Sequence, residues 1–204
     1  MKTWNVYLLR HGKTVGEPAL YGHSDVEVAA ETQAKIAQAL QAEALHYQRI
    51  QTSPLSRCVQ LAQRLHHAQP HIPLDVVSGW QEMAFGKFDG VPFAQLQQEW
   101  PQLEAFWQAP ASATLPQAES LESFYQRVSE HWQALIEQNE QDTLIVCHGG
   151  TIRMILAHVL KLDWQNPLLY SSLAIGHQSI THIQISLADQ HYFRVCCIAK
   201  PLAI

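Results

Sequence analysis

Apolar residues recur along this chain with two alternating periods. Compact runs rich in Leu, Ile, Val or Cys predict short β-strands at 4–9, 49–52, 74–77 and 143–147. Stretches in which apolar residues return every three or four positions predict helices at 29–45, 53–65, 121–136 and 151–160. Strands and helices therefore alternate along most of the chain.

Two of the predicted helices begin at recognisable N-terminal signals. Ser53 and Pro54 are typical of an N-cap followed by proline at the first helical position. Ser120 has the side chain of an N-cap and directly precedes the amphipathic run that starts at Leu121. We therefore expect one helix to open at Ser53 and another at Ser120.

The end of the chain has a different pattern. Two strand-like runs, 179–187 and 192–198, are separated by a polar segment and predict a hairpin. Alternating strands and helices followed by a hairpin predict a three-layer α/β/α sandwich, with a mostly parallel sheet and an antiparallel edge strand. The segment 83–120, aromatic-rich and interrupted by prolines, is expected to form an irregular excursion of loops and helical turns.

Length, composition and charge limit the class of protein. The chain has 204 residues, which suits one α/β domain, so we expect a single domain over 1–204. Hydrophobic residues make up 47% of the sequence, and no apolar run approaches the roughly 20 residues of a membrane span, so we expect a soluble protein. The net charge of -5 disfavours a nucleic-acid partner, because such binding needs clustered Lys and Arg.

The N-terminus and the cysteines bear on the compartment. The apolar run from Val6 to Leu9 is shorter than the roughly 7–15 residues of a signal-peptide core, so we expect no export. The four cysteines lack the spacing of a disulfide framework or a zinc site. We therefore expect reduced thiols and a cytoplasmic protein.

Polar motifs follow three of the predicted strands. Arg10-His11-Gly12 follows the first, Arg57 lies in the segment after the second, and His148-Gly149-Gly150 follows the strand at 143–147. In an α/β sheet, ligands bind at the edge where the carboxyl ends of parallel strands meet. We therefore expect these side chains to converge on one site.

The residue types in this site suit phosphate chemistry. The planar guanidinium of Arg57 can hold two phosphate oxygens in the first turn of a helix, where main-chain amides already favour an anion. An ordinary histidine titrates near pH ~6.5, so His11 or His148 can be a substantially neutral nucleophile near pH ~7. Each residue alone is more often an ordinary polar residue, and the joint placement at equivalent strand ends is what predicts an anion site.

With these motifs the sequence resembles the histidine phosphatase superfamily, in its phosphoglycerate-mutase-like branch, over nearly the whole chain. The family's three motifs read Arg10-His11-Gly12, Ser53-Pro54-Leu55-Ser56-Arg57 and His148-Gly149 here. The resemblance also selects Glu82, which is followed by an aromatic residue, a glycine and an acidic–glycine pair as in the family. The residues alone do not favour Glu82 over Glu17.

The resemblance implies hydrolysis through a phosphohistidine, with no cofactor and no metal. His11 would attack phosphorus, while Arg10, Arg57 and His148 would neutralise charge on the equatorial oxygens. Glu82 would protonate the leaving alkoxide and then deprotonate water. The expected catalytic residues are His11, Glu82 and His148, and the expected substrate-binding residues are Arg10, Arg57, Thr14 and Gly149.

One position departs from the family pattern. An asparagine often stands three residues after the position of Thr14, and this chain has Glu17 there. A carboxylate at that place would repel phosphate. We therefore expect Glu17 and Pro18 to turn away from the pocket.

Within the superfamily, the segment Ala118-Glu119-Ser120 and the segment 20–25 resemble the α-ribazole phosphatases of adenosylcobalamin synthesis, with Ala118 in place of their usual glycine. This implies a small phosphomonoester as partner, α-ribazole 5'-phosphate or adenosylcobalamin 5'-phosphate, and leaves a homodimer open. The aromatic residues that could pack the benzimidazole are Phe85, Phe88, Trp100, Phe106 and Trp107. A small satellite core is the alternative for each of them.

Three other functions fit the same motifs. A broad-specificity phosphatase would share every catalytic residue and lack a preference among phosphomonoesters. A phosphoglycerate mutase would return the phosphoryl group to a bound intermediate, and the absence of extra insertions disfavours it. A catalytically inactive sensor of phosphate ligands would need no nucleophile paired with an acid, so the complete residue set disfavours it too.

Overall fold

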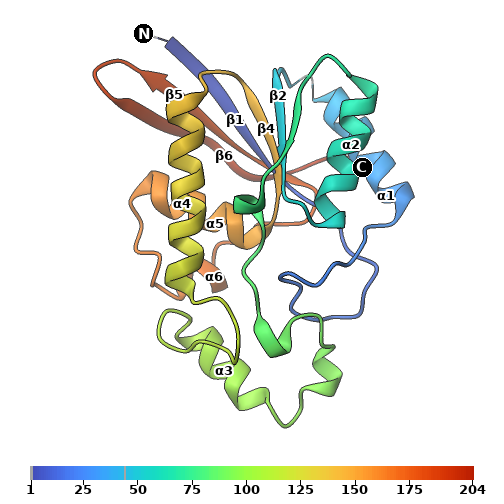
Figure 1. Cartoon of the computed structure of the whole chain (residues 1–204), viewed down its shortest axis with the longest axis vertical. Coiled ribbons are helices and arrows are strands. Elements are labelled where there is room, and N and C mark those ends of the chain that lie inside the picture. The colour runs from blue at the N-terminus through green and yellow to red at the C-terminus, as the bar shows by residue number, and fades with distance from the viewer. Residues whose placement is uncertain (1, 44) are drawn as a thin grey trace.

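The chain forms a six-stranded mixed sheet in the computed structural model, which describes residues 2–43 and 45–204. In the order β3-β2-β4-β1-β5-β6, the strands are Leu74–Val76, Arg49–Thr52, Thr143–Cys147, Lys2–Arg10, Ser179–Leu187 and His191–Pro201. The first four strands in this order are parallel, β5 is antiparallel to β1, and β6 is antiparallel to β5. The predicted parallel sheet with an antiparallel hairpin at its edge is confirmed (Figure 1).

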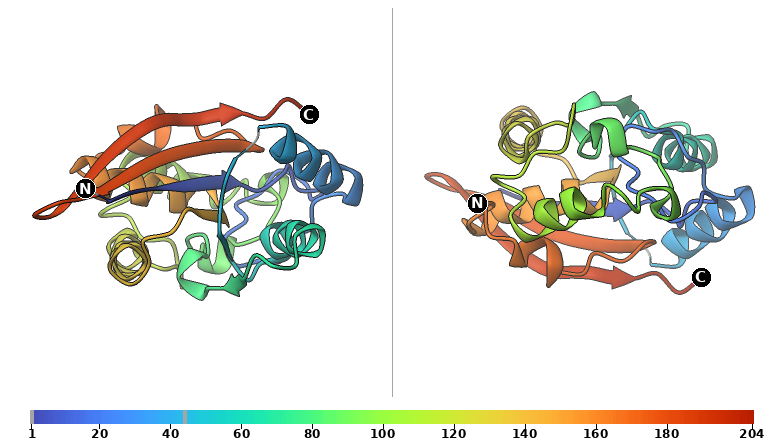
Figure 2. Two further views of the ribbon diagram at one scale, coloured as in Figure 1. Left: turned by 90° about the horizontal axis from the view of Figure 1, so that it is seen from above. Right: turned by 90° about the horizontal axis from the view of Figure 1, so that it is seen from below.

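Helices cover both faces of this sheet. Helices α1 (Ala30–Ala42) and α2 (Ser56–Ala68) pack against each other and share one apolar cluster with the sheet. Helices α4 (Leu121–Gln138) and α5 (Gly149–Leu160) do the same with the other cluster. The result is the predicted three-layer arrangement (Figure 2).

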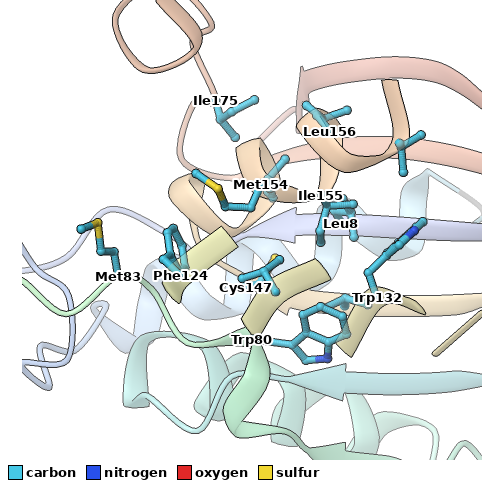
Figure 3. Packing of buried hydrophobic residues seen from close by; sticks show 14 of the residues in the cluster. Leu8, Trp80, Met83, Phe124, Trp132, Cys147, Met154, Ile155, Leu156 and Ile175 are labelled. Atoms are coloured by element: carbon cyan, nitrogen blue, oxygen red, sulfur yellow. The ribbon is translucent and has the colours of Figure 1, made fainter. Parts of the chain in front are cut away.

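Strand β1 supplies side chains to both clusters. Successive residues of a strand point to opposite faces, so Val6 and Leu8 enter the larger cluster while Tyr7 and Leu9 enter the smaller one. Figure 3 shows Leu8 packed among residues of the larger cluster, including Trp132 of α4. Because β1 is buried on both faces, the loop that follows it starts from a rigid position.

Helix α2 begins later than its sequence signal predicts. The N-cap is Leu55 and the first helical residue is Ser56, so the assignment of Ser53 as N-cap is wrong. The Asp25 carboxylate accepts both the Ser56 amide N–H and the Ser56 hydroxyl at 2.7 Å. A distant loop therefore supplies the cap, and the Ser53 hydroxyl accepts the amide of Leu55, ahead of the helix, at 3.4 Å.

The other helix boundaries agree more closely. Ser120 is the N-cap of α4 as predicted, since its hydroxyl accepts the Ser123 amide at 3.1 Å. Helix α5 starts at Gly149, two residues before the predicted start. Helix α1 ends at Ala42, short of the predicted limit at Leu45, and Ala44 lies outside the described residues.

The excursion at 83–120 is irregular over most of its length, as expected, but it also contains helix α3 (Trp100–Gln108). Pro101 interrupts the apolar pattern in the sequence, yet it lies in the first turn of α3, where a missing amide N–H costs no helical hydrogen bond. Short 3-10 turns at 86–88 and 93–95 precede α3, and the four-residue helix α6 (Leu168–Ser171) follows α5.

Candidate active site

The three predicted motifs meet at the carboxyl ends of adjacent parallel strands. Arg10 pairs with Cys147 across β1 and β4, so His11 and His148 leave the sheet side by side. Their rings are 5.1 Å apart between centroids, at 64°. Arg57 enters from α2 beside them, with its Nε 3.2 Å from His148 Nδ1. The convergence expected from the sequence is present.

His11 is buried and held in one tautomer. Its Nδ1 lies 2.7 Å from the carbonyl oxygen of Gly12, which can only accept, so Nδ1 carries the proton and Nε2 keeps the lone pair. Burial lowers the pKa of His11 well below its usual value, and the charges of Arg57 and Arg10 lower it further. His11 is therefore a neutral imidazole at neutral pH, with an unprotonated Nε2 that keeps its lone pair.

His148 is completely buried and both of its ring nitrogens are engaged. Nδ1 accepts the N–H of Arg57 Nε, so Nε2 carries the proton and donates to the Ser53 hydroxyl at 2.8 Å. Burial lowers the pKa of His148 well below its usual value, and the charge of Arg57 adds to this. The expectation that His148 neutralises phosphate charge is not matched by this geometry, because its ring is neutral and already paired.

The Arg57 side chain is fully buried and held by a loop. Its Nη1 donates to the Ser24 carbonyl at 2.9 Å, and its Nη2 donates to the carbonyls of Tyr21 and Gly22 at 3.1 and 2.5 Å. With the bond to His148, four of its five N–H groups are used. Arg57 therefore supplies a fixed positive charge beside both imidazoles and keeps one N–H for a ligand.

Arg10 lies on the other side of His11. Its Nη1 donates to the Ile175 carbonyl and its Nη2 lies 3.0 Å from His177 Nε2, while its buried Nε has no hydrogen-bond partner. A buried N–H without an acceptor costs about 1–3 kcal/mol. A phosphate oxygen would satisfy this group, so the geometry of Arg10 favours an anionic ligand.

Glu82 faces these groups from the loop before the 83–120 excursion. Its Oε2 accepts the amide of Gly150 at 2.9 Å and its Oε1 accepts the amide of Met83 at 3.0 Å. Glu82 and His11 line one cavity of about 370 Å³, and Thr14 and His177 lie in its wall. This cavity therefore brings a neutral imidazole, fixed cations and a carboxyl group together.

Two residues near this cavity differ from the sequence-based expectations. Glu17 lines the cavity as an exposed residue, so the expectation that it turns away is wrong, and Lys13 lies in the same rim. Gly149 lies under Arg10, since a Cβ there would be 3.3 Å from the Arg10 guanidinium carbon. The smallness of Gly149 thus makes room for Arg10.

A second cavity, of about 320 Å³, continues from the first past Glu82. Leu20, Glu82 and Phe85 line both cavities, so the two are adjoining compartments. The walls of the second are mainly apolar and include Phe106, Trp107 and Phe124. Of the five aromatic residues singled out in the sequence, Phe85, Phe106 and Trp107 line this apolar cavity.

The remaining two aromatic residues lie elsewhere. Phe88 is 4% exposed and belongs to the larger core cluster. Trp100 is on the surface and packs edge-on against Trp107 and Phe93, with ring centroids 5.3 and 6.2 Å away. Phe88 is therefore a residue of the main core, and Trp100 belongs to a small surface cluster of aromatic rings, so packing is the better description for both.

The family of this chain follows from a comparison with known protein families. The sequence profile of the histidine phosphatase superfamily (branch 1) matches residues 6–194. The chain belongs to this superfamily. In this superfamily member, the matched span contains every residue of the two cavities.

Individual relatives of this histidine phosphatase superfamily member have different activities. It is 26% identical over 163 residues to broad-specificity phosphatase YOR283W of Saccharomyces cerevisiae, covering 74% of this chain and 68% of the relative. It is 28% identical over 179 residues to a 2,3-bisphosphoglycerate-dependent phosphoglycerate mutase of Cytophaga hutchinsonii, covering 83% of each. The α-ribazole phosphatase of Shigella flexneri has the same fold, with a TM-score of 0.78, 22% identity and coverage of 98% and 99%.

His177 is a site residue of this superfamily member that the sequence reasoning missed. It bonds Arg10, its ring centroid is 5.4 Å from that of His11, and burial lowers its pKa to about 4, with the charges of Arg10 and Lys13 adding to this. A signal was available, since His177 precedes a strand predicted in a hairpin. An antiparallel strand begins at the edge where its parallel neighbours end, which is the edge that holds the site.

Neither a metal cluster nor a membrane-spanning helix is found among the described residues. Across 2–43 and 45–204, no group of three or more His, Cys, Asp or Glu side chains is arranged to hold a metal ion. Within the same ranges, no helix combines the length and the apolar character needed to span a membrane.

Proposed function

We propose that this protein hydrolyses small phosphate monoesters through a phosphohistidine formed at Nε2 of His11. The observation that carries the proposal is the hydrogen bond from His11 Nδ1 to the Gly12 carbonyl, which leaves the Nε2 lone pair available beside two guanidinium groups. A phosphate-binding protein without chemistry would need the cations only. A buried neutral imidazole that shares a cavity with Glu82 supports covalent catalysis.

In the first step, the lone pair of His11 Nε2 forms a bond to phosphorus while the ester P–O bond breaks. The leaving oxygen takes a proton from the carboxylic acid form of Glu82, and the bond pair departs with the alcohol. Arg10 and Arg57 supply positive charge where negative charge spreads over the equatorial oxygens. His148 acts indirectly, because its Nδ1 fixes the orientation of Arg57.

In the second step, water attacks the phosphohistidine. The Glu82 carboxylate takes one proton from the water as its oxygen bonds to phosphorus, and the P–N bond electrons return to His11. The products are inorganic phosphate and the starting enzyme. General acid–base assistance of this kind contributes about 10²–10⁴-fold.

Two measurements test this mechanism. We expect the wild type to release phosphate from p-nitrophenyl phosphate in EDTA and to yield an acid-labile, base-stable phosphoenzyme after rapid quenching. His11→Ala should remove both signals, because the Nε2 of His148 is paired with Ser53 and the Nε2 of His177 is paired with Arg10. Phosphate release by His11→Ala at the wild-type rate would refute the covalent mechanism.

For the substrate we propose α-ribazole 5'-phosphate. The apolar cavity of about 320 Å³ next to Glu82 suits a flat bicyclic base on the leaving-group side, with Phe85, Phe106 and Trp107 in its walls. The resemblance of segments 20–25 and 118–120 to α-ribazole phosphatases adds to this. The related adenosylcobalamin 5'-phosphate carries the same base.

A comparison of kcat/KM tests the substrate. We expect α-ribazole 5'-phosphate to exceed p-nitrophenyl phosphate and 3-phosphoglycerate by roughly a hundredfold, which is about 2.7 kcal/mol of transition-state binding. Trp107→Ala should reduce this preference, whereas Tyr192→Ala, an exposed aromatic residue of β6 outside the cavity, should leave it unchanged. If both variants changed all substrates equally, the cavity would have no part in substrate choice.

A broad-specificity phosphatase is the second candidate, favoured by the activity named for the yeast relative. It predicts similar kcat/KM values for all three esters. A phosphoglycerate mutase would instead transfer the phosphoryl group between glycerate positions faster than to water. The same assay separates these results, because product analysis distinguishes free phosphate from isomerised phosphoglycerate.

A further inference from the structure

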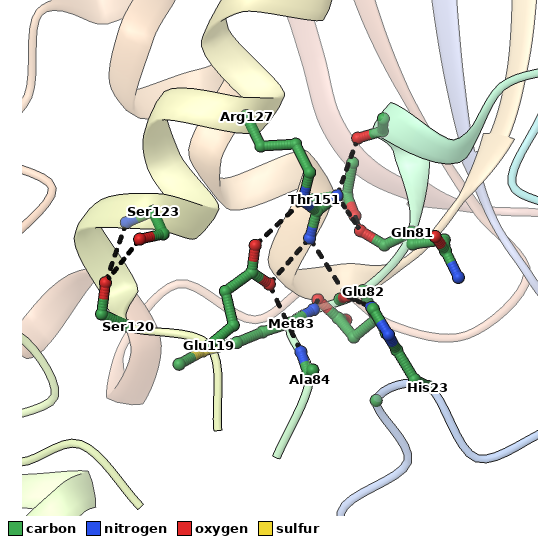
Figure 4. Close-up of polar contacts among 12 residues, drawn as sticks. His23, Gln81, Glu82, Met83, Ala84, Glu119, Ser120, Ser123, Arg127 and Thr151 are labelled. Atoms are coloured by element: carbon green, nitrogen blue, oxygen red, sulfur yellow. Dashed lines mark hydrogen bonds and ion pairs between the residues drawn. The ribbon is translucent and has the colours of Figure 1, made fainter. Parts of the chain in front are cut away.

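The segment that carries Glu82 lacks regular hydrogen bonding of its own. Residues 81–85 connect two 3-10 turns, so their carbonyl groups need donors from elsewhere. Arg127 of α4 supplies them. Its Nη1 donates to the carbonyls of Gly79 and Gln81 at 3.0 and 3.1 Å, and its Nη2 donates to the carbonyl of Glu82 at 3.3 Å (Figure 4).

Glu119 holds Arg127 in this position. Its two carboxylate oxygens accept from Arg127 Nε and Nη2 at 2.9 and 2.8 Å, and the two side chains are only 23% and 16% exposed. The main chain of Glu119 also pairs with the next part of the segment, since its amide donates to the Ala84 carbonyl at 3.0 Å. A paired, two-bond contact of this kind fixes the plane of the guanidinium.

Three further contacts add to the support. His23 Nε2 lies 3.0 Å from the Glu82 carbonyl (Figure 4). The Thr151 hydroxyl of α5 lies 3.3 and 3.2 Å from the carbonyls of Trp80 and Gln81. The Arg127 guanidinium lies 5.1 Å from the centre of the Phe124 ring, which also lines the apolar cavity. The main chain on both sides of the Glu82 carboxylate is therefore tied to α4 and α5.

We propose that the Arg127–Glu119 pair positions Glu82 for proton transfer. Neither side chain lines either cavity, so the pair acts through the main chain of Glu82 and not on the substrate. The inference rests on the proposed phosphohistidine mechanism, in which Glu82 gives its proton to the leaving oxygen and later takes one from water. Misplacing the carboxylate by a fraction of an ångström weakens proton transfer more than it weakens phosphate binding.

The leaving group provides a specific test. A nitrophenolate departs without a proton, whereas the alkoxide from 2-phenylethyl phosphate needs one. Arg127→Met removes the donors and keeps much of the side-chain volume. We expect it to lower kcat/KM for 2-phenylethyl phosphate by about 10²-fold, at the lower end of what general acids supply, and to change kcat/KM for p-nitrophenyl phosphate less than ~3-fold.

The second chemical step adds an independent readout. With p-nitrophenyl phosphate, the variant should form phosphohistidine at nearly the normal rate and hydrolyse it slowly, because water then lacks a well-placed base. We therefore expect a lower kcat, a burst of nitrophenol and accumulated phosphohistidine. A loss of folded protein would also lower the apparent kcat, but it would produce neither the burst nor the accumulated phosphohistidine. It would also leave the kcat/KM ratio between the two substrates unchanged, because that ratio does not depend on the active fraction.

Conservative variants and a control sharpen the test. Arg127→Lys keeps the charge without the planar fork and should give the same substrate-dependent loss in weaker form. The double variant Glu119→Gln/Arg127→Met should lose no more kcat/KM for 2-phenylethyl phosphate than Arg127→Met alone, because the two side chains act as one unit. The matched control is Arg49→Met, which breaks an Arg–Asp pair of 2.6 Å at the opposite edge of the sheet and should leave the substrate ratio unchanged.

The outcomes separate the two hypotheses. Absence of phosphohistidine in the wild type would refute the proposed function. Phosphohistidine in the wild type, with equal losses for both substrates in Arg127→Met and Arg127→Lys, would refute the positioning role alone. A selective loss for the alkyl ester, with a burst for the nitrophenyl ester, is the result that supports it.

Discussion

The Glu82 carboxylate and the Gly150 amide meet at a point where no side chain fits. The Oε2–N distance is 2.9 Å, and a Cβ on Gly150 would lie 2.2 Å from Glu82 Oε1. Gly150 is therefore required by close approach, since its φ is not positive. This contact ties the proposed proton donor to the N-terminus of α5, where the orphan amides of a helix favour a carboxylate.

Gly150→Ala should separate activity from stability. Alanine is about 1 kcal/mol more favourable than glycine within a helix, and this gain offsets the loss of the contact with Glu82. We therefore expect little change in the free energy of unfolding. The displaced Glu82 carboxylate should lower kcat at least tenfold, measured with 2-phenylethyl phosphate. Gly176→Ala is the matched control, because a Cβ there meets nothing within 4 Å. Equal activity of the two variants would contradict the close-contact argument.

The imidazoles of the site predict a pH-dependent stability. His11, His148 and His177 have lowered pKa values in the folded state, mainly through burial, so the unfolded chain binds more protons below its ordinary histidine pKa of ~6.5. The free energy of unfolding should therefore be at its full value above that pH and fall as the pH drops from 7 to 5. Each imidazole contributes at most about 1.4 kcal/mol per pH unit. Urea titrations at a series of pH values measure the slope.

A variant tests whether these imidazoles cause the slope. His148→Gln removes one buried titrating group and should make the slope shallower by up to about one bound proton. The range from pH 7 to 5 lies above the ordinary titration of carboxyl groups, which keeps their contribution small. An unchanged slope in His148→Gln would show that other groups are responsible.

Asp89 holds Arg57 in place indirectly, through the loop that lies between them. Its carboxylate accepts the amides of Gly22, His23 and Ser24 at 3.1, 2.8 and 2.9 Å, and the carbonyls of this same loop hold Arg57. Burial alone would raise the pKa of Asp89, but the hydrogen bonds from main-chain amides outweigh it and lower the pKa. Asp89 therefore stabilises the fold above its unfolded pKa, and this contribution is lost as the pH falls through the folded value.

Asp89→Asn should accordingly destabilise the protein by about 1–3 kcal/mol, the usual result when buried hydrogen bonds to a charged group are lost. Activity should fall as well, because the loop that orients Arg57 loosens. Asp189→Asn, in the exposed hairpin turn, is the control and should change neither quantity. Thermal unfolding and kcat/KM for p-nitrophenyl phosphate measure the two effects. An Asp89→Asn variant with wild-type values for both would exclude the route through this loop.

The four cysteines should react unequally with a thiol reagent. Cys58 and Cys147 are fully buried, and burial raises the pKa of each thiol, so both should stay unmodified in the native protein. Cys196 is exposed and Cys197 is half-buried on β6. We expect Cys196 to react first and all four to react in denaturant. Cys58 Sγ lies 3.6 Å from His148 Nε2, so rapid native modification of Cys58 would mean that the packing around His148 opens in solution.

Local pattern was sufficient for the elements and for the family motifs. The alternation in β1, the apolar run of β4 and the helical repeat of α4 are each encoded within about ten to twenty neighbouring residues, and Ser120 caps α4 from one residue away. The motifs at His11, Arg57 and His148 also lie directly at strand ends. Their convergence follows from the parallel arrangement of β1, β2 and β4, which the alternation of strands and helices predicts.

Hydrogen bonds between segments far apart in the chain could not be predicted from the local sequence pattern. Asp25 caps α2 from 31 residues away, which moved the helix start from Ser53 to Ser56. Once released from capping, Ser53 accepts the His148 Nε2 proton, and this bond together with Arg57 leaves His148 no nitrogen for a ligand. Burial of this kind depends on which segments pack together, so no spacing rule reveals it.

The sequence by itself determined the mostly parallel sheet with its antiparallel edge, the four main helices and the residues that gather at one edge, because these depend on periodicity and on residues close in the chain. Only the tertiary structure decided the tautomers of His11 and His148, the placement of Glu17 in the cavity rim, the role of His177 beside Arg10 and the grip of Arg127 on the Glu82 segment. The physical reason is that a proton position or a carbonyl contact is set by atoms within about 3 Å in space. In this protein those atoms come from segments up to 167 residues apart.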